Sequence, residues 1–221
     1  MDKQILLVTG WCQSAELYKQ LAEDLDATVD VINPLDIQGD RVQHICEMLH
    51  KSSYDCAIGC SMGANLLLRA FNRYPFNPKL ILISPVYKGL SVPHVPKWLS
   101  RLVLRLPLTG VLARYTVNDK KALTPLLLEA ARSSNVVVAA EALDGLFDQS
   151  WTSVNVSSAI LILGQFDKVV RRKGMLQLNK DIPKLKKYII PDCGHTLVTE
   201  AYTSLLNIVR KESGYTTTDV R

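Results

Sequence analysis

The feature that most constrains this chain is a serine with a glycine two residues away on either side, in the segment Gly59-Cys60-Ser61-Met62-Gly63. An apolar stretch, residues 54–58, precedes this segment, and strong helix formers follow it at residues 64–70. A chain that passes from a strand into a helix here turns so tightly that only small residues fit at the two glycine positions. The Ser61 oxygen would then stand at a helix N-terminus, where backbone N–H groups favour a developing negative charge.

Two further polar side chains follow apolar segments that are predicted to be buried strands. Asp167 comes shortly after residues 159–163, and His195 comes shortly after residues 185–190. The carboxyl ends of parallel strands meet at one edge of a sheet, so both side chains are expected beside Ser61. His195 could take the Ser61 proton while Asp167 holds the imidazole in the required tautomer, which predicts a Ser-His-Asp catalytic triad.

Two other aspartates compete with Asp167 for the acid position. Asp192 lies three residues before His195, and Asp144 lies in the long segment between the fourth and fifth predicted strands. Asp167 is preferred because it follows the strand that precedes the histidine strand.

Together these segments resemble the α/β-hydrolases over essentially the whole chain. In that superfamily the loop after the first strand supplies a second oxyanion donor, and here Gly10-Trp11-Cys12 directly follows a predicted strand at residues 3–9. The resemblance therefore implies that the backbone N–H groups of Trp11 and Met62 hold the oxyanion. Chemistry of this kind requires neither a metal nor an organic cofactor.

The secondary-structure pattern predicts an α/β protein with the α/β-hydrolase fold. Apolar runs predict strands at 4–9, 28–32, 54–59, 80–84, 159–163 and 186–190. Helices are expected between them at 14–25, 40–51, 63–73, 170–180 and 197–211. This alternation is typical of a minimal, mostly parallel sheet of about six strands. The expected core comprises residues 1–86 and 156–221, and residues 87–155 are expected to form a helical cap with helices at 97–106, 122–132 and 135–148.

Positive charge is concentrated at the start of this cap. Residues 88–121 hold seven basic side chains and one acid, Asp119, an excess larger than the +5 of the whole chain. Lys97, Arg101 and Arg105 are spaced four apart and would share one helix face. Such a face attracts acidic partners, of which an acyl carrier protein is one example. A solvated face without a partner and contact with anionic lipid are the alternatives. Nucleic acid is not expected, since aromatic residues are sparse.

Two short segments resemble the pimeloyl-[acyl-carrier protein] methyl ester esterases of biotin synthesis: Gly10-Trp11 with residues 14–18, and residues 167–173. The resemblance implies a serine carboxylic-ester hydrolase whose acyl substrate is held by an acidic carrier protein. Thr9 departs from the histidine that often precedes the oxyanion glycine. The alternatives are an acyl thioesterase, a short-chain carboxylesterase or lipase, a C–C hydrolase, and a non-catalytic ligand-binding protein of the same fold.

Composition is consistent with one globular domain. A chain of 221 residues that is 48% hydrophobic can bury a core without disulfides or metals. No apolar run approaches the roughly 18 residues of a membrane span, and no secretory signal pattern is present, so a cytoplasmic location is expected. The protein is expected to be a monomer. The five cysteines lack metal-like spacing and are expected to be reduced, although Cys12, Cys60 and Cys193 fall in loops that should border the site.

Overall fold

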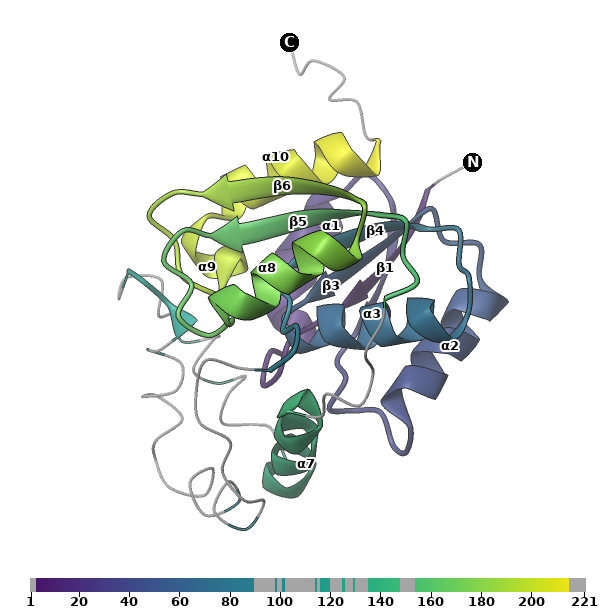
Figure 1. The fold of residues 1–221 in the computed structure, drawn as a ribbon, viewed down its shortest axis with the longest axis horizontal. Helices are drawn as coiled ribbons and strands as arrows, with labels where there is room; N and C mark the ends of the chain where they lie inside the picture. Colours follow the sequence, from purple (N-terminus) through teal and green to yellow (C-terminus); the bar gives the residue numbers. More distant parts are fainter. Residues whose placement is uncertain are drawn as a thin grey trace.

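Six parallel strands form one sheet in this computed structural model, which describes residues 3–89, 98, 101, 114, 116–119, 125, 129, 135–147 and 154–214 (Figure 1). The order across the sheet is β2-β1-β3-β4-β5-β6, and every neighbouring pair is parallel. Their bounds are β1 (Gln4–Val8), β2 (Thr28–Ile32), β3 (Cys56–Cys60), β4 (Lys79–Ile83), β5 (Ser158–Gly164) and β6 (Lys184–Ile190). The predicted six-stranded α/β architecture is therefore confirmed.

Helices connect the strands in the order η1 (Ala15–Tyr18), α1 (Lys19–Asp24), α2 (Arg41–Lys51), α3 (Met62–Arg73), α7 (Val136–Phe147), α8 (Arg172–Asp181), α9 (Leu197–Glu200) and α10 (Tyr202–Ser213). Two helices predicted as continuous are divided. The first begins as a 3-10 turn and becomes α-helical at Lys19, and the last is broken at Ala201, whose φ of −142° is not helical. The helices predicted at 97–106 and 122–132 lie outside the described residues.

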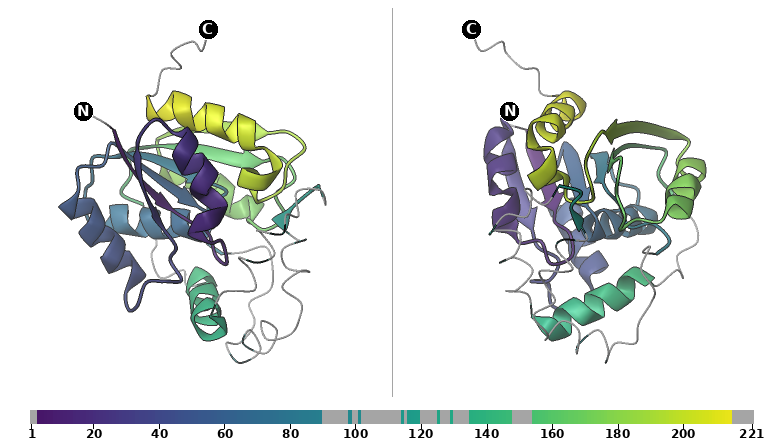
Figure 2. Two further views of the ribbon diagram at one scale, coloured as in Figure 1. Left: turned by 180° about the vertical axis from the view of Figure 1, so that it is seen from behind. Right: turned by 90° about the vertical axis from the view of Figure 1, so that its left-hand side faces the viewer.

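The sheet buries both of its faces. Side chains alternate between faces along each strand, so Leu6 and Val8 of β1 pack towards α2, α3 and α8, while Ile5 and Leu7 pack towards α1, α9 and α10. Figures 1 and 2 show these helices covering opposite sides of the sheet. Burial on both faces explains why the central strands are almost continuously apolar in sequence.

Asp40 connects the start of α2 to the end of α3. Its Oδ1 accepts hydrogen bonds from the backbone N–H groups of Val42 and Gln43, at 2.9 and 3.1 Å, as a helix N-cap. Its Oδ2 lies 3.1 Å from a guanidinium nitrogen of Arg73. The first turn of α2 is thereby fixed beside the face of α3.

The junction between β3 and α3 is a strained turn. Ser61 has φ 51° and ψ −108°, in the positive-φ region that non-glycine residues rarely adopt. A Cβ atom on Gly63 would lie 2.1 Å from the backbone oxygen of Val8, and one on Gly59 would lie 2.5 Å from the Cα of Ala64. The two glycines thus allow α3 to start directly against β1, which leaves Ser61 at the carboxyl edge of the sheet.

The close approach at Gly63 predicts a stability difference between two glycine substitutions. Gly63→Ala is expected to lower the free energy of unfolding by about 1–3 kcal/mol, since β1 and α3 must separate. Gly145→Ala in α7 is the matched control, because a Cβ there meets no atom within 4 Å. It is expected to raise stability by up to about 1 kcal/mol through helix propensity. Urea unfolding of both variants measures this, and equal stability of the two would contradict the account of the turn.

Candidate active site

Three side chains predicted from the sequence meet at the carboxyl edge of the sheet, where Ser61 follows β3, Asp167 follows β5 and His195 follows β6. Nε2 of His195 lies 2.8 Å from Oγ of Ser61, and its Nδ1 lies 2.8 Å from Oδ2 of Asp167. A carboxylate only accepts hydrogen bonds, so Nδ1 carries the proton and Nε2 is free to accept the serine proton. The two bonds form a continuous path for proton transfer.

Asp167 is held on both of its oxygens. Oδ1 accepts from the backbone N–H groups of Val169 and Val170, at 2.8 and 3.2 Å, while Oδ2 faces His195. Burial raises the pKa of this carboxyl, but the charge and hydrogen bond of His195, helped by the two backbone N–H groups, outweigh it and hold the pKa below its usual range. Asp167 is therefore a carboxylate at neutral pH, as stabilisation of an imidazolium requires.

The competing aspartates do not occupy the acid position. Asp192 is exposed, and its backbone N–H donates to Oε1 of Gln165 at 3.3 Å. Asp144 lies on α7, whereas Nδ1 of His195 bonds to Asp167.

The two predicted oxyanion donors flank the serine. Met62 is the first residue of α3, and Trp11 belongs to the loop after β1, in which a Cβ built on Gly10 would lie 3.2 Å from the Ser61 Cβ. Within the described residues, no hydrogen bond is made by the backbone N–H of either Trp11 or Met62. Both donors are therefore available to a substrate oxygen.

The loop after β1 is shaped by Gln13, which the sequence analysis did not single out. Its Oε1 accepts from the backbone N–H of Gly10 at 3.0 Å and from the Tyr18 hydroxyl at 2.6 Å, and its backbone carbonyl accepts from the Thr9 hydroxyl at 2.7 Å. Gln13 and Thr9 are both buried. Because Gly10 is held by a side chain, its neighbour Trp11 is fixed in position.

The ring of Trp11 is directed to α7. Its Nε1 donates to the carbonyl of Ala139 at 2.8 Å, and the half-buried indole packs against the core cluster that includes Ala139 and Ala142. The same residue thus places a backbone N–H beside Ser61 and binds a helix of the predicted cap.

A second segment of the predicted cap holds the histidine loop. The Thr116 carbonyl accepts from the backbone N–H of His195 at 2.7 Å and from that of Thr196 at 3.2 Å. The Glu200 carboxylate accepts from Gly194 at 2.7 Å and from the N–H groups of Asn118 and Asp119. No sequence motif marks Thr116 or Glu200 as partners of the histidine loop. The only clue in the sequence is that Glu200 lies close to His195 along the chain.

The predicted basic face is described at one position, since Lys97 and Arg105 lie outside the described residues. Arg101 is 3.3 Å from the carboxylate of Glu141 on α7, and both side chains are about half exposed. Arg101 therefore contributes to contacts within the insertion.

The cysteines near the site are buried thiols. Cys12, Cys60 and Cys193 are each at most 7% exposed. Burial raises the pKa of the Cys60 thiol to about 12, so it is not an activated nucleophile. His44 and His50 of α2 are exposed and lie away from the triad.

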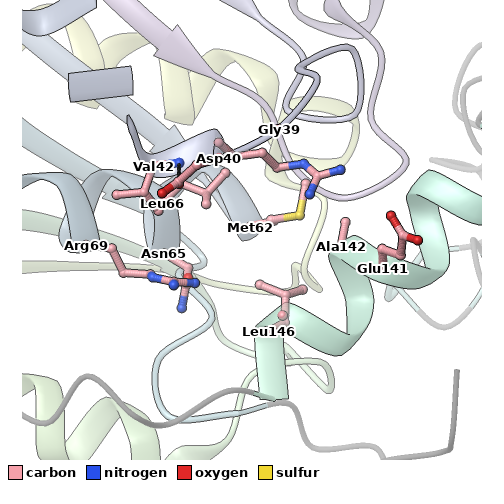
Figure 3. A pocket seen from close by; sticks show the side chains of 12 residues that line it. Gly39, Asp40, Val42, Met62, Asn65, Leu66, Arg69, Glu141, Ala142 and Leu146 are labelled. Carbon is pink, nitrogen blue, oxygen red and sulfur yellow. Dashed lines mark hydrogen bonds between the residues drawn. The ribbon is translucent and has the colours of Figure 1, made fainter. Parts of the chain in front are cut away.

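A pocket of about 190 Å³ lies between α3, α7 and the start of α2 (Figure 3). Met62 and Leu66 form part of its α3 wall, and Ala142 and Leu146 form part of its α7 wall. We call it the α3–α7 pocket. Met62, which directly follows Ser61 in the chain, is the residue of this pocket that is nearest to the serine in sequence.

The described residues lack two other kinds of feature. They contain no helix that is both long and apolar enough to cross a membrane. They also contain no group of three or more histidine, cysteine, aspartate or glutamate side chains arranged to hold a metal ion.

Comparison with known proteins finds structural neighbours. No protein-family model matches the chain, and no significant match is found among curated protein sequences. An esterase from Exiguobacterium antarcticum superposes with a TM-score of 0.78 at 13% identity, covering 96% of this chain and 92% of that one. A hydrolase from Oleispira antarctica gives 0.77 at 13% identity, covering 98% and 92%. The 2-hydroxy-6-oxo-6-phenylhexa-2,4-dienoate hydrolase from Rhodococcus sp. gives 0.72 at 16%, covering 96% and 90%.

These neighbours share one architecture, and this chain has it: the α/β-hydrolase fold. The fold class predicted from the sequence is confirmed. Superpositions of this quality establish the fold alone, and the case for an activity depends on the geometry of the site.

Replacement of Asp167 by asparagine is expected to reduce activity far more than the same replacement of Asp192. Asp167→Asn keeps the shape of the side chain but favours the wrong histidine tautomer, so kcat for ester hydrolysis is expected to fall by about four orders of magnitude. Asp192→Asn is the matched control, because asparagine tolerates the positive φ of 57° found there. It is expected to change kcat less than about tenfold. The reverse order of effects would show that Asp167 is not the acid.

Proposed function

We propose that this protein is a serine hydrolase of carboxylic esters, with Ser61 as nucleophile, His195 as general base and acid, and Asp167 as the group that orients the histidine. The observation that carries the proposal is the pair of 2.8 Å hydrogen bonds joining the three side chains at the end of a strained turn. A binding protein would have no need for a serine held in this conformation against a base.

The reaction proceeds in two acyl-transfer steps. Ser61 attacks the ester carbonyl while His195 takes its proton, and the backbone N–H groups of Trp11 and Met62 hold the oxyanion. The imidazolium, stabilised by Asp167, then protonates the leaving alcohol. In the second step His195 takes a proton from water, which attacks the acyl-serine and releases the acid.

The insertion at residues 87–155 is assigned the role of a cap over this site. Two contacts support the assignment: Trp11 with Ala139, and Thr116 with the backbone of His195. Each joins the insertion to a loop that carries part of the catalytic machinery. The proposed division is a core at residues 1–86 and 156–221 and a cap at residues 87–155.

The particular substrate proposed is a pimeloyl methyl ester carried by an acyl carrier protein. The support is the similarity of Gly10-Trp11 and of residues 167–173 to the esterases of biotin synthesis, together with the basic excess in residues 88–121. An acidic carrier would be attracted by that charge, and the attraction should weaken as salt rises.

Replacement of the nucleophile tests the hydrolase assignment. Ser61→Ala is expected to remain folded and to lose at least about three orders of magnitude in kcat for p-nitrophenyl esters, since only binding and oxyanion stabilisation remain. Thermal unfolding is the control for folding. Retention of most of the activity by Ser61→Ala would contradict the mechanism.

A substrate series separates the carrier-bound ester from the alternatives. The expected result is a kcat/KM for the carrier-bound pimeloyl methyl ester that exceeds that of the free methyl ester and declines with salt. Equal rates on both, at any salt, would favour a general carboxylesterase. Faster turnover of thioesters would favour a thioesterase, and no turnover by a folded protein would favour a ligand-binding role.

A further inference from the structure

The α3–α7 pocket carries two guanidinium groups that no carboxylate neutralises directly. Arg69 of α3 and Arg41, the first residue of α2, both line it and are half-buried. In the described part of the chain neither arginine forms an ion pair, although Nε of Arg41 donates to the Pro34 carbonyl at 2.8 Å. Glu141 lies close enough to favour the charge of Arg41.

Both acidic residues that line the pocket form ion pairs with arginines that do not line it. Asp40 caps α2 and pairs with Arg73, 3.1 Å away. Glu141 pairs with Arg101, 3.3 Å away. Neither Arg73 nor Arg101 lines the pocket. The pocket and these two ion-pair partners together hold four guanidinium groups against two carboxylates.

Asn65 adds an unsatisfied acceptor to the same wall. It is 2% exposed, and its Nδ2 donates to the Val86 carbonyl at 2.8 Å, which fixes the orientation of the amide. Oδ1 has no hydrogen-bond partner. A buried acceptor without a partner is costly, and here it belongs to a residue that lines the pocket.

Arg69 stands one helical turn after Asn65, so the two side chains share a face of α3. Figure 3 shows them together on the α3 side of the pocket, across from Ala142 and Leu146. A guanidinium has five N–H donors. Arg69 can therefore donate to Oδ1 of Asn65 while its other N–H groups bind an anion.

From this arrangement we propose that the α3–α7 pocket binds an anionic group of the substrate, a carboxylate or a phosphate, with Arg69 and Arg41 as its cationic partners. Arginine recognises both groups by paired N–H donors. A volume of about 190 Å³ is below that of a drug-sized site, so it suits the end of a longer ligand. Ala142 and Leu146 provide an apolar wall for the adjoining carbon chain.

Assignment of the anion to a substrate depends on the proposed hydrolase function, whereas the binding of an anion does not. Met62 lines the pocket and directly follows Ser61, and the proposal takes an ester carbonyl at Ser61 and a charged group in the pocket to belong to one molecule. A carboxylate would come from the half-ester of a dicarboxylic acid, and a phosphate from a phosphopantetheine arm.

The experiment compares two pairs of esters that differ in charge. One pair is monomethyl pimelate and dimethyl pimelate; the other is the methyl-pimeloyl thioester of pantetheine 4′-phosphate and that of pantetheine. The expected result is that kcat/KM for at least one anionic ester exceeds that of its neutral partner by about tenfold or more. The pair that shows this preference identifies the source of the anion.

Arg69→Gln is expected to abolish the preference, and Arg41→Gln to reduce it. Arg172→Gln, on the exposed surface of α8, is the matched control for loss of one positive charge and should keep the preference. A wild-type enzyme without charge preference, or one whose preference survives both pocket substitutions, would overturn the proposal.

A binding measurement separates this proposal from the hydrolase assignment. Pimelate and pantetheine 4′-phosphate are titrated calorimetrically into the wild-type protein, Arg69→Gln and Arg172→Gln. Binding of either anion that is weakened about tenfold or more by Arg69→Gln alone supports the pocket, even if no ester is hydrolysed. Absence of binding by both anions would overturn it, even if neutral esters are hydrolysed.

Discussion

The site depends on the close contact between the start of α3 and the end of β1. With no side chain at Gly63, the helix begins against the backbone of Val8, and Ser61 is held at a positive φ with its oxygen facing His195. Such strain persists only where the surroundings enforce it. The buried sheet does so here, since β3 is paired on both sides and is buried at every residue. A rigid core thus maintains a conformation that a serine would not adopt alone.

The loops of the site are also held by groups outside the triad, some near in sequence and some distant. Gln13 fixes the loop after β1, Thr116 and Glu200 fix the backbone around His195, and Ala139 binds the Trp11 ring. Two of these four partners lie in the insertion between β4 and β5. The geometry of the reacting groups is therefore coupled to the insertion, and changes there should reach the histidine and the oxyanion loop.

Much of this could be predicted from the sequence because the strong signals are local. Apolar runs identified all six strands, and a polar residue after three of them indicated which side chains would meet at the carboxyl edge of the sheet. The contribution of Gln13 could not be predicted, because a single glutamine that accepts a hydrogen bond from a backbone N–H produces no periodic pattern in the sequence. The break at Ala201 was missed because residues 197–211 contain no proline or glycine to mark it. The α3–α7 pocket also depends on side chains from three helices, and their arrangement follows from packing.

The central claim is that Ser61 is an activated nucleophile. It is tested most directly by reacting the folded protein with a fluorophosphonate and locating the adduct by mass spectrometry. We expect one adduct per chain, on Ser61, with labelling strongly slowed when His195 is replaced by alanine. A folded wild-type protein that is not labelled, or one labelled at another residue, would contradict this account of the site.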